Sequence, residues 1–427
     1  MFGTPPQPLN LTLNFAGDLL SPWGVDCNFC AGEALYDHAL TTTMKGMPDM
    51  EWGTSVGFSG HYVQDTVGFE GILSAKDQPF VVMDVASQAS TDIPRLLNGH
   101  LGLFVNKTAA NTGIFKRLWD QGSLLNPVMG MRWDPMKPRL TIGALDPEDY
   151  IGEINWVPLE DRYTATGGIY QTNEFHIDGV KGFNGSLLPF PENPTAILHA
   201  CHIVSSAISV SRTIQVPPNN PYALNVNYTG PQQLINIYPN GGFGLGPCNA
   251  TQEEIPYVHF AVTINGVDYP IDSLNNLLRG PSGMSAQGVC NVGISNTTTP
   301  APGEEIPSDF SLGLPFFRSV YIAYRFPTDD CPGFYGFAFP SGLNRTSSIT
   351  AQKPTSTPEL ASQCLGLTAP TSTPSPDISG VSAQSWHDTQ TSGEYALYGT
   401  SEQVRLMDAE LLEVLKWDTG LLMRTGK

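Results

Sequence analysis

Glycine and proline interrupt this chain so often that long helices are excluded. Its 427 residues include 43 glycines and 36 prolines, both of which are unfavourable inside helices. Between them lie short runs of β-branched and aromatic residues, for example residues 9–15, 257–264 and 320–326. Runs of this length, bounded by turn residues, are typical of short β-strands. We therefore predict an all-β protein.

The composition indicates a folded and acidic chain. Hydrophobic residues make up 41% and charged residues only 14% of the sequence, which is enough apolar material for a core. The formal net charge is −19, so no basic surface is available to replace the counterions of a nucleic acid. An acidic surplus suits a secreted protein that works at low pH, or it serves solubility alone. No apolar run is long enough to span a membrane.

Sequons and cysteines indicate the secretory pathway. Acceptor sequences for N-glycosylation occur at Asn10, Asn106, Asn184, Asn227, Asn249, Asn296 and Asn344. The seven cysteines fit an oxidising compartment with three disulfides and one cysteine left over. No signal peptide precedes Gly3. We expect a secreted or lumenal protein whose signal peptide is not in this sequence; the alternative is a cytosolic protein with unused sequons.

The composition changes near residue 343. Residues 343–400 are rich in Ser, Thr and Pro, which predicts a disordered stalk that O-glycans could cover. Residues 402–416 carry apolar side chains at near-helical spacing, so residues 401–427 are predicted to form a short amphipathic helix and a tail. That helix would bind a partner or be an incidental terminal segment.

Several motifs, in chain order, resemble the pepsin-like aspartic peptidases. They are Gly3-Thr-Pro-Pro-Gln7, Trp23, Gly60 to Val67, Asn98-Gly-His-Leu-Gly-Leu103, Leu140-Thr-Ile-Gly143, Tyr150-Ile-Gly152, Trp156-Val-Pro158, Ala196-Ile-Leu198, Leu312-Gly313, Phe316-Phe-Arg318 and Gly336-Phe-Ala338. Each motif is weak alone, but together they cover about residues 3–340 in the family's order.

The resemblance implies a bilobal β fold with a central cleft. The first lobe would comprise residues 1–165, without the family's first strand, and the second lobe residues 166–342. Each lobe of the family contributes one Asp-Thr-Gly loop. The two carboxylates share a proton across a water molecule, because like charges that close cannot both ionise. Both aspartates are therefore needed for hydrolysis.

Both catalytic positions hold other residues in this chain. Where the family has Phe-Asp-Thr-Gly, alignment on Gly17 places Phe15 at the catalytic position, and a shift of one residue places Asn14 there. A further shift is needed to bring in Asp18. In the second loop His199 takes the place of the aspartate. The family's flap tyrosine is replaced by Trp52.

Other candidate sites are weaker. His199, Cys201 and His202 are too close in sequence to make a tetrahedral metal site, and a Cys-His nucleophile pair needs neighbouring side chains that point the same way. The literal Asp-Thr-Gly at Asp418 lies in the tail, without the paired strands that hold such a loop. We expect no metal and no cofactor.

The resemblance also implies a disulfide pattern. Cys248–Cys290 matches the family's second-lobe bridge, and Cys27–Cys30 lies where a first-lobe bridge follows the tryptophan. Cys331–Cys364 is then the remaining pair, which leaves Cys201 free and buried.

We hypothesise a pseudopeptidase of the pepsin fold, monomeric, whose cleft binds without cutting. Its ligand would be a peptide, a protein or a small apolar molecule, held by Phe15, Trp52 and His199. The rival hypothesis is an enzyme, either a residual hydrolase or a cleft adapted to tailor a metabolite. A decayed gene and a structural glycoprotein without a ligand are the simpler alternatives.

Overall fold

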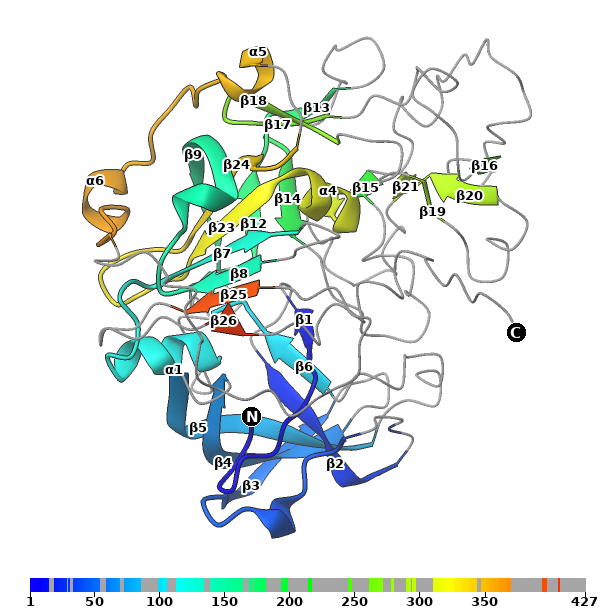
Figure 1. Ribbon diagram of the computed structural model, residues 1–427, viewed down its shortest axis with the longest axis vertical. Helices are drawn as coiled ribbons and strands as arrows, with labels where there is room; N and C mark the ends of the chain where they lie inside the picture. The colour runs from blue at the N-terminus through cyan, green and yellow to red at the C-terminus, as the bar shows by residue number, and fades with distance from the viewer. Residues whose placement is uncertain are drawn as a thin grey trace. The chain divides into compact units, whose positions relative to one another are not determined.

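The structure is a computed structural model that describes part of the chain. The described residues are 1–14, 19–28, 30, 34–53, 59–69, 73–85, 99–105, 113–133, 139–163, 169–171, 173–181, 193–198, 214–216, 245–247, 261–271, 278–279, 289–292, 294–296, 310–343, 347–369, 394–397 and 406–407. They are mostly β-strand (Figure 1). The predicted fold class is therefore supported at the level of a mostly β protein.

The chain divides into two compact units. The first unit contains Met1–Asp149, Ala323–Gly333 and Leu360–Leu415, and the second contains Tyr150–Ile322, Phe334–Glu359 and Lys416–Lys427. The division after residue 149 differs from the predicted one after residue 165. The reason is strand pairing: β9 (Tyr150–Pro158) pairs antiparallel with β24 (Phe334–Pro340), so both belong to the second unit.

The first unit is built on a six-stranded sheet in the order β1-β6-β2-β5-β4-β3 (blue to cyan in Figure 1). Its strands are β1 (Thr12–Asn14), β2 (Leu20–Asn28), β3 (Lys45–Gly53), β4 (Ser59–Phe69), β5 (Leu73–Val85) and β6 (Gly99–Gly102). The buried rings of Phe2, Tyr36 and Phe80 meet edge to face with centroids 5.2–6.0 Å apart. Such aromatic contacts add to the burial of apolar surface, which stabilises the sheet.

The remaining elements of the first unit are short. They are the 3-10 helices η1 (His38–Leu40) and η3 (Pro147–Asp149), the helix α1 (Ile114–Asp120), and the strands β7 (Val128–Arg132), β8 (Arg139–Ile142), β25 (Glu394–Leu397) and β26 (Leu406–Met407). Helix α1 buries Ile114, Phe115 and Leu118, the spacing expected of a helix with one apolar face.

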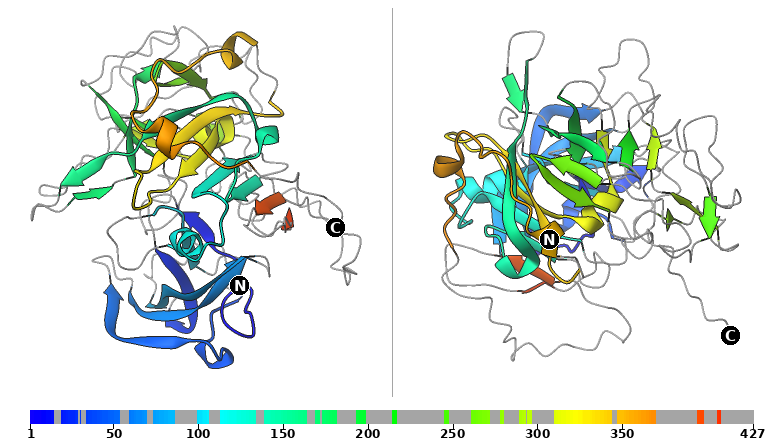
Figure 2. Two further views of the ribbon diagram at one scale, coloured as in Figure 1. Left: turned by 90° about the vertical axis from the view of Figure 1, so that its left-hand side faces the viewer. Right: turned by 90° about the horizontal axis from the view of Figure 1, so that it is seen from above.

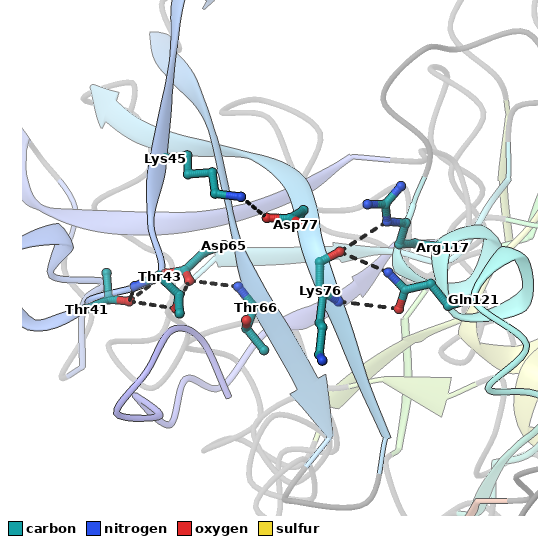
Figure 3. A network of polar contacts seen from close by, with 9 residues as sticks. All are labelled: Thr41, Thr43, Lys45, Asp65, Thr66, Lys76, Asp77, Arg117 and Gln121. Carbon is teal, nitrogen blue, oxygen red and sulfur yellow. Dashed lines mark hydrogen bonds and ion pairs between the residues drawn. The ribbon is translucent and has the colours of Figure 1, made fainter.

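One buried carboxylate in the first unit is held by hydroxyl and backbone N–H donors (Figure 3). Asp65 is fully buried on β4 and accepts hydrogen bonds from the hydroxyls of Tyr36 (2.9 Å), Thr41 (3.0 Å) and Thr43 (2.5 Å), and from the backbone N–H of Thr66 (2.7 Å). Figure 3 shows the contacts with Thr41, Thr43 and Thr66. These four donors satisfy the carboxylate in place of water. Burial and the bond to Asp65 raise the pKa of Tyr36 above its ordinary value.

The second unit contains several small sheets and an aromatic core. Its helices are α4 (Leu314–Ser319) and α5 (Ser347–Thr350). Its strands are β9, β10 (Asp161–Tyr163), β11 (Ile169–Gln171), β12 (Glu174–His176), β13 (Gly179–Lys181), β14 (Thr195–Leu198), β15 (Ile214–Val216), β16 (Leu245–Pro247), β17 (Ala261–Ile264), β18 (Val267–Pro270), β19 (Leu278–Arg279), β20 (Val289–Val292), β21 (Ile294–Asn296), β22 (Phe310–Leu312) and β24. Strand β23 (Tyr321–Arg325) begins in this unit and ends in the first. Phe175, Tyr269 and Phe337 are buried at the centre.

Part of the predicted stalk is folded. Residues 347–369 include α5 and α6 (Ala361–Cys364), and a disulfide joins Cys331 to Cys364. The composition of this segment suggested disorder because its own side chains bury little surface, but partners elsewhere in the chain supply its hydrogen bonds. In the predicted terminal helix the structure describes only β26, a strand paired with β25.

Candidate functional site

The same strand arrangement occurs once in each unit. In the first unit β6 lies between β1, which runs parallel to it, and β2, which runs antiparallel. In the second unit β22 lies between β14, again parallel, and β15, again antiparallel. In both units the chain leaves the strand that is parallel to the central strand. After the connecting segment it enters the antiparallel strand, which lies on the other side of the central strand. The two connecting segments are those where the sequence analysis placed the catalytic positions.

The strand registers relate the two copies residue by residue. Leu13 pairs with Leu101, the residue before Gly102, and Leu198 pairs with Leu312, the residue before Gly313. Leu13 therefore corresponds to Leu198. The next residue along the chain is Asn14 in the first copy and His199 in the second.

The connecting segments themselves lie outside the described residues. This applies to Phe15 and Asp18 in the first copy and to His199, Cys201 and His202 in the second. The first segment is bounded closely: Asn14 is opposite Gly102, and the backbone N–H of Gly102 donates to the carbonyl of Leu19 at 2.9 Å. The loop is thus attached to β6 at both of its ends.

A polar contact that the sequence analysis missed fixes the end of β14. The side-chain amide of Asn173 donates to the carbonyl of Leu198 at 3.1 Å, and the hydroxyl of the buried Tyr335 donates to the amide oxygen of Asn173. Because Leu198 directly precedes His199, Asn173 holds the strand end from which the second loop departs. Nothing in the sequence pattern signals this contact, since 25 residues separate Asn173 from Leu198.

Trp52, the predicted counterpart of the family's flap tyrosine, lies in a β-hairpin formed by β3 and β4. The backbone of Trp52 in β3 pairs with Gly60 in β4, and Gly53 pairs with Ser59. Residues 54–58, which connect the two strands, lie outside the described part of the chain. One residue beyond Gly60 on β4, Nδ1 of His61 lies 2.8 Å from a carboxylate oxygen of Asp84, and both side chains are about half exposed.

Two of the three expected disulfides are present in the structure, Cys27–Cys30 and Cys331–Cys364. Cys248 lies outside the described residues, as do all the sequons except those of Asn10 and Asn296. Among the residues that the structure describes, no group of three or more His, Cys, Asp or Glu side chains is arranged to hold a metal ion.

Two β-rich units, each with one copy of this strand and loop motif, define the acid-protease class of folds. Residues 2–331 match the eukaryotic aspartyl protease family, so the chain belongs to that family. The family is named for aspartic-type endopeptidases, and its cleft binds peptides. Family membership and the two disulfides are typical of proteins of the secretory pathway.

Named relatives cover different shares of the chain. Pregnancy-associated glycoprotein 4 of Ovis aries is 30% identical over 299 residues, which is 66% of this chain and 68% of that protein. Pepsin A of Suncus murinus is 23% identical over 332 residues, 75% of this chain and 76% of that protein. Pregnancy-associated glycoprotein 1 of Ovis aries is 31% identical over 173 residues, 37% of this chain; the match spans less than half of that glycoprotein, 43% of its length.

The described helices include none that is both long and apolar enough to cross a membrane.

Proposed function

We propose that this chain is a catalytically inactive aspartic protease homologue that binds a ligand in the cleft of its family. The ligand is a peptide, a segment of a protein or a small apolar molecule. The observation that carries the proposal is the absence of a carboxylate from the residues aligned with the two catalytic positions and their neighbours. Residues 13–17 contain no Asp or Glu, and neither does the whole stretch between Glu192 and Glu253.

The second stretch makes the proposal independent of the exact alignment. Any register that keeps the strand Thr195–Leu198 in place must take its second catalytic residue from the residues that follow, and none of the next 54 carries a carboxylate. A shared proton between two carboxylates therefore has no candidate partner in this loop.

The strand registers support Asn14, rather than Phe15, as the residue that matches His199. Leu13 and Leu198 occupy equivalent positions in the two copies, and Asn14 and His199 follow them directly. An amide and an imidazole can both donate and accept hydrogen bonds. Together they suit a site that binds the backbone of a peptide without polarising water for attack on it.

Peptide cleavage is the direct test. The purified full chain, incubated with haemoglobin or casein between about pH 2 and 6, the range in which a carboxylate pair shares its proton, should release no peptides in a pepstatin-sensitive manner. Asp18→Asn is the informative variant because Asp18 is the one acid in the first loop, and Asp26→Asn is the matched control outside it. Pepstatin-sensitive cleavage that disappears in Asp18→Asn alone would establish the rival hypothesis of a residual hydrolase.

Ligand binding is the second part of the test. A peptide and small-molecule screen at pH 5 and pH 7.5, followed by tryptophan fluorescence and melting temperature, should find ligands whose affinity changes between the two pH values, since histidine changes its charge in this range. Trp52→Ala and Asn14→Ala should weaken binding. If no compound shifts either signal and both variants only lower stability, the binding proposal fails.

A further inference from the structure

The two disulfides that the structure describes differ in the access of solvent to their sulfur atoms. Cys331 and Cys364 are 6% and 4% exposed and lie 33 positions apart in the sequence. Cys27 and Cys30 lie three positions apart, and both are partly exposed. Thiol–disulfide exchange begins when a thiolate attacks a sulfur, so its rate depends on the access to that sulfur. In the folded protein, Cys27–Cys30 is therefore the pair that a thiol in solution can reach.

The small size of the Cys27–Cys30 ring lets the fold survive its opening. A disulfide stabilises a protein mainly by restricting the unfolded chain, and it does so more when the loop that it closes is long. From the two sequence separations, the short ring adds roughly 30-fold less to the equilibrium constant of folding than the loop of Cys331 and Cys364 does. Opening the short ring should therefore change the first unit locally, without unfolding it.

The ring lies at the end of the sheet where the β3–β4 hairpin turns. Within the ring, Asn28 is the last residue of β2 and pairs with Val85, the last residue of β5. Val85 also pairs with Ser59, the first residue of β4, and Ser59 pairs with Gly53, the last residue of β3. The four residues form one row across strands that lie side by side, drawn in blue in Figure 1 and in the left view of Figure 2. The ring thus encloses one end of this row.

The strand pairing is irregular on both sides of β5 near this row. Asp84 is an extra residue of β5, inserted next to Val85 where the register between β4 and β5 shifts, and such a bulge interrupts the ladder of hydrogen bonds. The ion pair of Asp84 with His61 is half exposed at both partners, so it adds little stability. The register between β2 and β5 also shifts before Asn28. The covalent ring around Asn28 is therefore a large part of what holds β2 against β5 at this end.

We propose that Cys27–Cys30 is a thiol-exchange site for small thiols of the glutathione class, and that its opening loosens the end of the sheet where the β3–β4 hairpin turns. The thiolate of the small molecule attacks one sulfur, a mixed disulfide forms, and the other cysteine leaves as a thiolate that takes a proton from water. A second small thiol then attacks the mixed disulfide. The two small molecules leave joined as their own disulfide, and the protein keeps the two electrons and two protons that they lose. The inference does not depend on the proposed function, because it concerns the first unit alone.

Differential alkylation of the folded full chain measures the exchange. The protein carries Cys201→Ser, which removes the cysteine expected to be free, and is incubated with an excess of reduced glutathione. After acid quenching and alkylation, mass spectrometry of its peptides follows each disulfide. Cys27–Cys30 should open at least about a hundredfold faster than Cys331–Cys364, because a thiol reaches the buried pair only after local unfolding. Similar rates for the two pairs, or a Cys27–Cys30 pair that stays closed, would overturn the proposal.

Amide hydrogen exchange measures the consequence for the sheet. Once the ring is open, peptides that contain residues 59–61 and 83–85 should exchange about tenfold faster, because local opening of this end becomes easier. The other end of β4 and β5 is an internal control, since Phe69 and Leu73 pair there, far along the strands from the row. Exchange around these two residues should not change. Equal acceleration at both ends, or none at the row, would contradict the proposed link between the ring and the hairpin.

Serine variants separate the effect of the ring from other effects of the added thiol. The double variant Cys27→Ser/Cys30→Ser should show the same faster exchange at the row without any glutathione, and glutathione should then change nothing further. The matched control, Cys331→Ser/Cys364→Ser, removes the buried disulfide and should lower the melting temperature without a selective effect at the row. If the two double variants give the same exchange pattern, the row responds to general destabilisation and the proposal fails.

Discussion

Two buried arginines of the first unit have different kinds of hydrogen-bond partner. Arg139 is 9% exposed and pairs with two carboxylates, Asp146 at 2.7 Å and Asp149 at 3.1 Å. Arg325 is 4% exposed and, within the described part of the chain, donates only to neutral acceptors. These are the carbonyls of Cys364 (2.8 Å), Phe326 (2.9 Å) and Pro332 (3.0 Å) and the hydroxyl of Thr328 (3.3 Å).

The difference appears in the pKa values of the two guanidinium groups. Burial acts to lower the pKa of Arg139, but the charges of Asp149 and Asp146 outweigh it and raise that pKa above its ordinary value. For Arg325 burial prevails and lowers the pKa to about 10. A charged partner thus compensates burial more fully than carbonyl dipoles do. The carbonyls have a different effect: they join Arg325 to Cys364 of α6 and to Pro332 in the loop before β24.

Removing Arg139 should have the largest effect. Arg139→Met leaves two buried carboxylates without this partner, and we expect a loss of about 3–5 kcal/mol in the free energy of unfolding. Urea unfolding of the full chain measures it. The triple variant with Asp146→Asn and Asp149→Asn should recover much of the loss. If the triple variant is no more stable than Arg139→Met, the loss comes from packing and not from unpaired charge.

Removing Arg325 should cost less, because only neutral groups lose a partner. Arg325→Met leaves the carbonyls of Cys364 and Pro332 without this donor, and we expect a loss of about 2–3 kcal/mol. Arg325→Lys should recover part of it. Arg117→Met is the control, since Arg117 donates to the carbonyl of Lys76 at an exposed position. If Arg325→Met lowers the free energy of unfolding no more than Arg117→Met does, the hydrogen bonds of Arg325 to the surrounding carbonyls do not stabilise the fold.

The smallest effect concerns the pH dependence of the Arg139 cluster. Burial raises the pKa of Asp149, against the opposing charges of Arg139 and Arg132. A carboxyl group with a raised pKa in the folded state contributes stability below its unfolded pKa, about 4, and loses that contribution as the pH rises through its folded pKa. Asp149→Asn, which stays uncharged, should therefore be less harmful relative to wild type at pH 7 than at pH 4.

The free energy of unfolding, measured at pH 4 and pH 7, checks this expectation. Asp146→Asn is the control, because Asp146 pairs with the same guanidinium of Arg139. A cost of Asp149→Asn that is larger at pH 7 than at pH 4 would mean that the arginines, and not burial, determine the charge of Asp149.

The two arginines also show how far sequence reasoning reaches. Arg139, Asp146 and Asp149 lie within eleven residues, in a segment whose resemblance to the family was visible beforehand. The positions of short strands such as β17 and β23 were likewise close to the predicted runs 257–264 and 320–326. By contrast, the contacts of Arg325 with Cys364 and of Asn126 with Thr368 join residues 39 and 242 positions apart. No local pattern encodes such pairs.

The sequence by itself determined the β class, the family and the absence of Asp and Glu from residues 13–17 and 193–252, because these follow from turn residues, motif order and residue identity. Only the tertiary structure decided the boundary after Asp149, the correspondence of Leu13 with Leu198, and the folding of residues 347–369. Each of these depends on which distant backbone groups pair. A Ser/Thr/Pro-rich segment looks disordered when its own side chains are counted, and becomes ordered when asparagines elsewhere in the chain supply its hydrogen bonds.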